Sequence, residues 1–483
     1  MKILKIFLLI NAIFFQVAKA NAVVEWESVF NDLIKKSGHE KANLGLIVED
    51  GDKIIFSHNP DKLFVPASLT KLVTAGALLK NVPLNTKFKT YLKSSAKISN
   101  SELQGDLCFE GGGDPSFVSE KMWFLVNELT RYQIKKINGN IIVDGSRFDR
   151  EIYDSGRDST RVDRAYDAPV SALSFNWNAV NVYVRPTQPG NPAKVFIDPE
   201  NSLVELDNQS KTVAKDFVKS IIVERKTKKI QKNGKTEYVD VIVVSGNIGK
   251  NTPELVFYKS ITDPEVWSGT HLIEFLKQRN ITTNGQIKYG RCAEGDTTLA
   301  EVSSKNFSEM VADMLKFSNN FVAEMLVKNL GALNGAKPSS MKEGIEVLKK
   351  YLDELGMKRD SYELVNVSGL TRDNRFSVKQ LNTVLKRSLN DFDIYPEFVS
   401  GLAISGVDGT LKSRFKNMTN PPKIRAKTGY LDGVVGLSGY LDLKGRQPLV
   451  FTFLYNGGYE KALSSRDLFD ELLMKFNQKY QGE

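Results

Sequence analysis

The stretch VPASLTKLVT, residues 65–74, places Ser68 three positions before Lys71 at the start of a helical pattern. Pro66 precedes apolar residues that recur at helical spacing as far as Leu78, so we expect a helix that begins near Ser68. Residues three apart on a helix share one face, which brings the hydroxyl and the amine together. The stretch alone leaves two interpretations open: a serine nucleophile with a lysine base, or a helix-capping serine beside a solvated lysine.

The Ser-x-x-Lys pattern is weak evidence by itself, because it recurs at residues 94–97, 339–342 and 413–416. Two further motifs strengthen the catalytic interpretation. Ser318-Asn319-Asn320 interrupts an amphipathic helical pattern, and Lys427-Thr428-Gly429 occurs once, in a strand-like context. The ordered set of Ser-x-x-Lys, Ser-x-Asn and Lys-Thr-Gly, each in the expected type of element, indicates a serine–lysine acyl-transfer site.

The residue types of this set suit that chemistry. We expect Ser68 to be the nucleophile and Lys71 its base. A lysine acts as a base when burial or a second cation destabilises its ammonium form, and Lys427 supplies the second cation. The backbone N–H groups of Ser68 and Tyr430 are expected to stabilise the oxyanion.

The remaining motif residues are expected to hold the substrate and its leaving group. Ser318 would relay a proton to the leaving amine, and the Asn320 amide would bind the peptide group of the substrate. The charge of Lys427 and the hydroxyl of Thr428 suit a free terminal carboxylate. Gly429 completes the predicted substrate-binding strand with Thr428 and Tyr430.

Residues 1–20 have the pattern of a secretory signal peptide: a positive start, an apolar run over residues 6–17, and small residues at positions 18 and 20. A membrane anchor needs about 20 apolar residues, and this run is shorter. We therefore expect cleavage before Asn21 and a secreted or periplasmic protein without a stable membrane anchor.

The charge of the chain is mildly positive. Removing the three lysines of residues 1–20 leaves 63 of the 66 basic residues against 57 acidic ones, a net charge of +6. The basic residues are dispersed, which argues against nucleic acid as a partner and fits loose association with an anionic envelope polymer. The densest basic run, residues 224–235, is predicted to be a hairpin that turns at Asn233-Gly234.

The chain has two cysteines and three histidines. Cys108 and Cys292 could pair in an oxidising compartment, but their positions in the sequence leave this open. The histidines lack metal-ligand spacing and the setting of a Ser-His-Asp triad. We therefore expect a hydrolase that works without histidine, metal or cofactor.

Strand and helix patterns predict an α+β fold in which one domain is interrupted by another. Residues 43–60 read as a hairpin, short strand-like runs dominate from about 90 to 290, and helices return from about 300. The chain ends in strands and an amphipathic helix, for which packing on the sheet is favoured over membrane binding. We predict a discontinuous catalytic domain of residues 21–90 and 291–483, split by a β-rich insert of one or two domains at 91–290.

The motifs resemble the penicillin-binding D-alanyl-D-alanine carboxypeptidase/endopeptidase family of low-molecular-mass class C, over nearly the whole chain after residue 20. The resemblance implies a serine β-lactamase/transpeptidase-like domain that is split between its first and second motifs. The 250 residues between Ser68 and Ser318 agree with such a split. The stretches that carry it are PASLTKLVT, GGGDPSF, INGNIIVDGSRF, APVSALSFNWNAVNV, VSGLTRDNRFS, SGVDGTL and AKTGYLDGV.

The resemblance implies hydrolysis of the terminal D-Ala-D-Ala bond and of D-Ala–diaminopimelate cross-links in peptidoglycan stem peptides. It also implies an acyl-enzyme at Ser68 and covalent inhibition by β-lactams. Arg372 matches a family position that contacts the substrate side chain, and Asp163 is the nearest candidate for the acidic residue that recognises the amine of that side chain. Tyr430 departs from the small hydroxyl residue that is usual after Lys-Thr-Gly in the family.

Two other functions are compatible with part of the motif set. A β-lactamase or β-lactamase-like esterase would need a glutamate that aims a deacylating water, whereas the glutamates of residues 341–356 lie on a predicted helix. A non-catalytic peptidoglycan-binding protein would have no need of all five motif residues. The D,D-peptidase interpretation accounts for the whole set, which is Ser68, Lys71, Ser318, Asn320 and Lys427.

Overall fold

A computed structural model describes residues 26–157, 162–232, 235–416 and 418–481, so the predicted signal peptide lies outside the described residues. The described residues form two compact units. Unit 1 is made of the segments Met1–Asn81, Val311–Asn319 and Ile345–Glu483. Unit 2 is made of Val82–Met310 and Asn320–Gly344. Unit 2 therefore includes a segment after the second motif, which the sequence assigned to the catalytic domain. The assignment of a catalytic domain and an insert stays a prediction.

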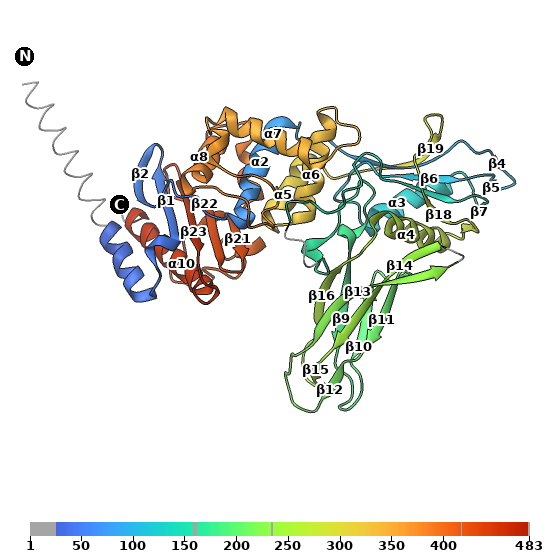
Figure 1. Cartoon of the computed structure of the whole chain (residues 1–483), viewed down its shortest axis with the longest axis horizontal. Helices are drawn as coiled ribbons and strands as arrows, with labels where there is room; N and C mark the ends of the chain where they lie inside the picture. The colour runs from blue at the N-terminus through green and yellow to red at the C-terminus, as the bar shows by residue number, and fades with distance from the viewer. Residues whose placement is uncertain (1–25, 158–161, 233–234, 417, 482–483) are drawn as a thin grey trace, which may run out of the picture. The chain divides into compact units, whose positions relative to one another are not determined.

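Unit 1 is built on a six-stranded antiparallel sheet with the order β2-β1-β23-β22-β21-β20 (Figure 1). β1 pairs with β23, so the N-terminal hairpin and the C-terminal strands belong to one sheet. The predicted hairpin of residues 43–60 is confirmed. The strands are β1 (Leu44–Asp50), β2 (Lys53–His58), β20 (Ala403–Ile404), β21 (Ile424–Leu431), β22 (Val434–Leu441) and β23 (Leu449–Asn456).

Helices cover both faces of this sheet, which confirms the predicted α+β class. The three central strands are apolar along most of their length because both of their faces are buried. On one face, Asn382 of α8 donates to Glu49 of β1 and accepts from Thr452 of β23. The helices wholly in unit 1 are residues 26–37, α2 (Thr70–Asn81), α8 (Val378–Leu389), α9 (Tyr395–Gly401) and α10 (Tyr459–Gln481). Helices α5 (Phe307–Lys316) and α7 (Met341–Glu354) belong to unit 1 from Val311 and from Ile345 onward.

The opposite face of the sheet is covered by residues 26–37 and α10. Leu468, Leu472 and Phe476 of α10 join the core that the sheet forms on this side, and Trp26 stacks on Phe476 with ring centroids 3.9 Å apart. The prediction that the last helix packs on the sheet is confirmed. Among the described residues, the structure has no helix that is long and apolar enough to cross a bilayer.

The described residues of unit 2 form five small sheets, with the orders β10-β9-β16, β11-β14-β13, β12-β15, β17-β7-β5-β4 and β18-β8-β6-β3-β19. Its helices are α3 (Ser119–Thr130), α4 (Pro264–Gln278) and α6 (Asn320–Leu333). The first nine strands are β3 (Lys89–Ser94), β4 (Ile98–Ser99), β5 (Glu102–Leu103), β6 (Leu107–Glu110), β7 (Lys136–Ile137), β8 (Ile141–Asp144), β9 (Ala179–Arg185), β10 (Lys194–Asp198) and β11 (Val204–Asn208). The others are β12 (Lys211–Val213), β13 (Ile222–Lys232), β14 (Lys235–Ser245), β15 (Asn247–Gly249), β16 (Leu255–Ser260), β17 (Thr282–Thr283), β18 (Ile287–Tyr289) and β19 (Thr297–Ser303).

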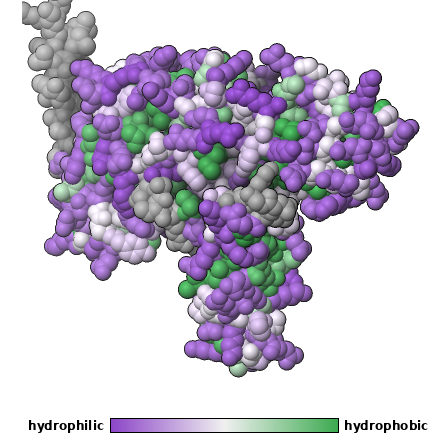
Figure 2. Space-filling model, turned by 45° about the vertical axis from the view of Figure 1, so that its right-hand side comes forward, coloured by the Kyte–Doolittle hydropathy of each residue, from purple (hydrophilic) through white to green (hydrophobic). Residues whose placement is uncertain are grey.

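One hydrophobic core runs through these sheets. Leu125 of α3, Val182 of β9, Ile242 of β14 and Trp267 of α4 all belong to it. β13 and β14 pair antiparallel, as predicted for the basic run, although its turn residues 233–234 lie outside the described residues. Most of the molecular face visible in Figure 2 is hydrophilic, with hydrophobic residues in smaller patches.

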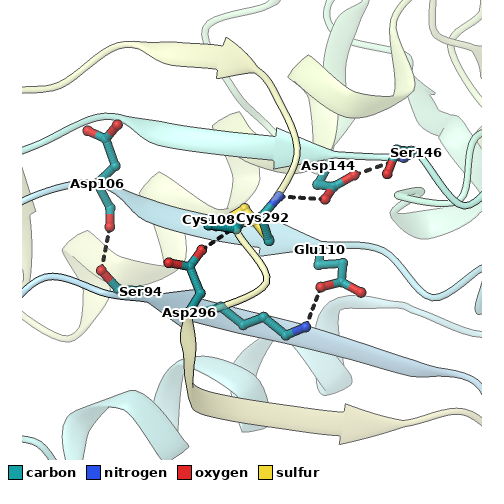
Figure 3. Close-up of a disulfide and its surroundings, with 10 residues drawn as sticks. Ser94, Asp106, Cys108, Glu110, Asp144, Ser146, Cys292 and Asp296 are labelled. Atoms are coloured by element: carbon teal, nitrogen blue, oxygen red, sulfur yellow. Dashed lines mark hydrogen bonds and ion pairs between the residues drawn. A yellow bond between two sulfur atoms is a disulfide. The ribbon is translucent and has the colours of Figure 1, made fainter.

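Cys108 and Cys292 form a disulfide in unit 2, which answers a question that the sequence left open. Figure 3 shows the bond between β6 and the segment after β18. The Asp144 carboxylate accepts the backbone N–H groups of Cys292 at 2.7 Å and of Ser146 at 2.9 Å. The disulfide therefore joins two parts of unit 2 that are 184 residues apart in sequence.

We predict that replacing both cysteines with serine lowers the free energy of unfolding by about 2–5 kcal/mol, because the unfolded chain loses a long-range constraint. Urea unfolding followed by tryptophan fluorescence measures the change. Dithiothreitol should lower the stability of the wild-type protein and leave the double variant unchanged. Equal stability of the two proteins without reductant would contradict a structural role for the disulfide.

Candidate active site

Ser68 lies in a tight turn that leads into a helix of unit 1. Ala67–Leu69 forms a single 3₁₀ turn, η2, and α2 begins at Thr70. Ala67 has a φ of 47°, a strained conformation that is common at functional sites. The Ser68 hydroxyl accepts a hydrogen bond of 3.2 Å from Lys71 Nζ, and η2 has no side-chain cap. This arrangement favours a serine–lysine pair over a capping serine.

A loop that precedes α8, residues 366–374, packs along η2 and α2; we call it the Ser368 loop. Its Ser368 carbonyl accepts a second hydrogen bond from Lys71 Nζ. One turn further along α2, the Thr74 hydroxyl donates to the Val367 carbonyl at 2.8 Å. The loop thereby fixes the lysine that faces Ser68. The stretch VSGLTRDNRFS carries part of the resemblance, but no sequence pattern marks Ser368 as a site residue.

Two glycines allow the backbone to approach the Ser68 turn closely. Gly369 of the Ser368 loop has a φ of +78°, and a Cβ there would lie 2.0 Å from the Ala67 oxygen and 3.0 Å from the Ser68 nitrogen. A Cβ on Gly429 of β21 would lie 2.9 Å from the Pro66 oxygen. The loop and the strand therefore both contact the turn, and a side chain at either position would displace it.

Lys71 and Lys427 are fully buried. Lys427 lies on β21 and donates to Ser318 Oγ and to the Thr428 carbonyl, both at 2.8 Å. Burial, together with the positive charge of Lys71, holds the pKa of Lys427 well below its usual value. The structure thus brings Ser68, Lys71, Ser318 and Lys427 together in unit 1, with each serine bonded to one lysine.

Ser318 lies between α5 and α6 and has a φ of 56°. A second loop, residues 405–411, holds the chain beside it through a 2.7 Å ion pair between Lys316 and Asp408. This loop contains the stretch SGVDGTL, which is part of the resemblance. A strained serine that two neighbouring segments hold in place is consistent with a functional role.

Asn320 is the first residue of α6 and belongs to unit 2. Its Nδ2 donates to the Tyr166 carbonyl at 3.1 Å. A carbonyl is an acceptor only, so this bond sets which end of the Asn320 amide faces the Tyr166 segment. The amide is therefore oriented by a loop that lies about 150 residues earlier in the chain.

The outer edge of β21 carries the other predicted strand residues. β20 pairs only with Arg425 and Ala426, so β21 continues past the end of its neighbour. Thr428 Oγ1 donates to Thr410 at 2.8 Å. Tyr430 is 41% exposed, and the Arg466 guanidinium lies 5.1 Å from the centre of its ring. Tyr430 and Arg466 therefore form an aromatic–cation pair directly after Lys427-Thr428-Gly429.

The two predicted contacts for the substrate side chain differ in their surroundings. Arg372 Nη2 donates to the Asp432 carbonyl, at the turn that follows β21, so it lies in unit 1 at the end of the strand that carries Lys427. Asp163 lies in unit 2 and forms a largely buried ion pair with Lys259 at 2.7 Å. An ammonium group of a substrate would have to compete with Lys259 for this carboxylate.

The three histidines in the described residues form hydrogen bonds with partners other than the motif residues. His39 contacts Ser465, and His58 contacts the Lys41 carbonyl. His271 is buried in unit 2 beside Asn201, and burial lowers its pKa to about 3. No described histidine is bonded to Ser68.

Within the described residues, Cys108, Asp144 and Cys292 are the one group of His, Cys, Asp or Glu side chains with the spacing of a metal site. Both sulfur atoms belong to the disulfide and are not thiolates, and Asp144 accepts two backbone N–H groups (Figure 3). This group is therefore a structural cluster.

Comparison with known proteins places the chain in a family. Residues 28–475 match the sequence profile of the D-Ala-D-Ala carboxypeptidase 3 (S13) family. The chain is 26% identical over 458 residues to a D-alanyl-D-alanine carboxypeptidase of Actinomadura sp. (strain R39), covering 91% of this chain and 82% of the relative.

Two crystal structures of penicillin-binding protein 4 from Haemophilus influenzae have a similar fold. The first superposes with a TM-score of 0.77 at 22% identity, covering 94% of this chain and 99% of the other. The second, in complex with a β-lactam, has a TM-score of 0.72 at 23% identity with the same coverage. These matches support the predicted fold for nearly the whole chain.

We predict that Gly369→Ala destabilises the protein by about 2–5 kcal/mol, since the left-handed conformation costs about 1–2 kcal/mol and the collision with the Ser68 turn about 1–3 kcal/mol more. Denaturant unfolding measures the total. Gly445→Ala is the matched control, because Gly445 has a φ of +77° and no described atom within 4 Å of its would-be Cβ. An equal loss of unfolding free energy in the two variants would show that the Ser68 turn does not restrict the side chain at position 369.

Proposed function

We infer a mechanism from one premise: the chain belongs to the D-Ala-D-Ala carboxypeptidase 3 (S13) family and is a serine-type D-Ala-D-Ala carboxypeptidase. We propose that its nucleophile is Ser68 and its substrate a peptidoglycan stem peptide that ends in D-Ala-D-Ala. The observation that carries the proposal is the hydrogen bond between Lys71 Nζ and Ser68 Oγ beside the second buried lysine, Lys427.

In the first step, neutral Lys71 removes the proton of the Ser68 hydroxyl, and Ser68 Oγ attacks the carbonyl carbon of the penultimate D-Ala. Burial favours the neutral form of an amine, and a neighbouring ammonium group favours it further. The Ser368 carbonyl holds Lys71 in place during the transfer. A serine activated in this way needs no histidine.

The attack places a negative charge on the former carbonyl oxygen. The backbone N–H groups of Ser68 and Tyr430 are the proposed donors to this oxyanion. Gly429 brings β21 against the Ser68 turn, so the two backbone segments run close together. The strain at Ala67 is consistent with a turn held in place for this purpose.

Collapse of the tetrahedral intermediate breaks the peptide bond and leaves an ester on Ser68. Ser318 relays the proton that Lys71 took from Ser68 to the departing amine of the terminal D-Ala, which returns Lys71 to its neutral form. The Ser318 hydroxyl is held by Lys427 at 2.8 Å. Asn320 binds the peptide group of the substrate. Water then hydrolyses the ester, and Lys71 is the group positioned to accept a proton from that water.

Lys427 and Thr428 are the proposed contacts of the free carboxylate of the substrate. Arg372 and Asp163 are proposed contacts of its side chain, with Lys259 as a competitor for Asp163.

The D-Ala–diaminopimelate cross-link differs from the carboxypeptidase substrate only in the leaving amine, so endopeptidase activity follows from the same acyl-enzyme. A β-lactam would acylate Ser68 and remain attached. The signal-peptide pattern of residues 1–20 favours a periplasmic or secreted location for the enzyme.

We predict that Ser68→Ala abolishes release of D-Ala from a synthetic pentapeptide ending in D-Ala-D-Ala, because the acceptor of the acyl group is gone. Quantification of free D-Ala measures the rate. Ser413→Ala is the matched control, because Ser413 also begins a Ser-x-x-Lys stretch but is exposed. Activity in Ser68→Ala, or its loss in Ser413→Ala, would contradict the proposed mechanism.

We also predict that Thr428→Val lowers kcat/KM about 10- to 150-fold for a peptide with a free terminal carboxylate, since a hydrogen bond to a charged group contributes about 1.5–3 kcal/mol. The same peptide amidated at its carboxyl terminus, which keeps the scissile bond and lacks the carboxylate, should lose less than threefold. An equal loss on both substrates would argue against a carboxylate contact at Thr428.

A further inference from the structure

Helix α6 carries three polar side chains on one face, at intervals of four residues. These are Asn320, Glu324 and Lys328, and residues four apart lie one above the other on a helix. The side chains of Glu324 and Lys328 are only 1% and 2% exposed. Charged groups are almost never buried to this extent unless they are paired. The face therefore has specific partners, and all of those described here belong to unit 2.

Glu324 is paired with Arg157, whose side chain is 3% exposed. Arg157 Nε donates to Glu324 Oε1 at 2.9 Å, and Nη2 donates to Oε2. Two parallel hydrogen bonds between a guanidinium and a carboxylate fix direction as well as charge. The pair therefore defines the orientation of the Arg157 fork against α6.

The same fork also holds a loop of unit 2. Arg157 Nη1 donates to the Asp167 carbonyl at 3.0 Å, and both terminal nitrogens lie 3.3 Å from the Ala168 carbonyl. The residue before Asp167 is Tyr166, whose carbonyl accepts the Nδ2 of Asn320 at 3.1 Å. Arg157 thus binds the two residues that follow the partner of Asn320.

These contacts form a closed ring. It runs from Asn320 to Tyr166, along the backbone to Ala168, through Arg157 to Glu324, and back to Asn320 over one turn of α6. In a closed ring the position of each member is set by the others. The Tyr166 carbonyl therefore cannot shift relative to Asn320 unless the bond of Arg157 to the loop or to Glu324 yields.

The orientation of the Asn320 amide depends on that carbonyl. An asparagine side chain has an oxygen that accepts and a nitrogen that donates, and the two ends exchange when the amide rotates by half a turn. Rotation would place the Asn320 amide oxygen next to the Tyr166 carbonyl oxygen. Both oxygens are acceptors, so they cannot form a hydrogen bond with each other. A fixed Tyr166 carbonyl therefore keeps Nδ2 toward the loop and Oδ1 on the opposite side.

We propose that the buried Arg157–Glu324 pair is a positioning device that sets the direction of the Asn320 amide for the substrate. This inference rests on the proposed role of Asn320 in binding the peptide group. Neither Arg157 nor Glu324 needs to touch the substrate; both act through the loop of residues 166–168. The free enzyme already holds the amide in one direction, so no reorganisation is needed when the substrate binds.

The next turn of α6 supplies a matched control. Lys328 donates to Asp149 at 2.6 Å and to the Glu151 carbonyl at 2.7 Å, so it is also a buried, paired charge that joins α6 to an earlier segment. Its partners do not include the loop of residues 166–168. Loss of this pair should weaken unit 2 without freeing the Asn320 amide.

The test compares Glu324→Gln and Arg157→Lys with Lys328→Met in the full mature chain. We expect all three to lower the melting temperature, and only the first two to lower the second-order rate of Ser68 acylation by a fluorescent penicillin, by about 10- to 100-fold. Arg157→Lys keeps the charge but loses the fork, so it tests the geometry even if Glu324→Gln does not fold. An equal acylation rate in all four proteins would overturn the proposal.

A double-variant comparison separates positioning from general weakening. In an Asn320→Ala background the amide is absent, so Arg157→Lys should reduce the acylation rate less than twofold further. A reduction by the same factor with and without Asn320 would also overturn the proposal. If the proposed function is wrong, the wild-type enzyme is not acylated at Ser68. That outcome differs from a wild-type enzyme that is acylated at the same rate as its variants.

Discussion

Burial of two lysine side chains in unit 1 is the constraint on which the site depends. Lys71 and Lys427 are both fully buried, and an unpaired buried charge costs several kcal/mol. The protein meets this cost with oxygen acceptors, namely a serine hydroxyl and a backbone carbonyl for each lysine. Burial and the charge of Lys71 lower the pKa of Lys427, so the two lysines carry one positive charge between them more readily than two. The contacts that make burial possible are also those that the proposed proton transfer uses.

The architecture of unit 1 follows from this constraint. Lys71 lies on α2 and Lys427 on β21, so the two lysines meet only if the helix packs closely on the sheet. Gly429 removes the side chain that would keep β21 from the Ser68 turn, and Gly369 does the same for the Ser368 loop. β1 and β23 pair at the centre of the sheet, so strands from both ends of the chain support the lysines. The polar face of α6 then orients Asn320 within unit 2.

The sequence predicted those parts of the site that side-chain chemistry determines. Ser68, Lys71, Ser318 and Lys427 carry the motifs, and the hairpin and helices around them follow the expected periodicity. The Ser368 carbonyl was missed because any residue offers a carbonyl, so the sequence does not mark it. The Lys259 partner of Asp163 was missed because the pair depends on tertiary packing across 96 residues. The disulfide stayed open for the same reason, and the residues between Asn320 and Gly344 belong to unit 2 by contacts that no local pattern reveals.

The central claim is that Ser68, activated by buried lysine, forms the acyl-enzyme. Intact-mass analysis of the mature protein after incubation with benzylpenicillin, followed by peptide mapping, tests it most directly. The account predicts one covalent adduct per chain, on the peptide that contains Ser68. An adduct on another residue would contradict the assignment of the nucleophile, and hydrolysed drug without any lasting adduct would indicate a β-lactamase instead.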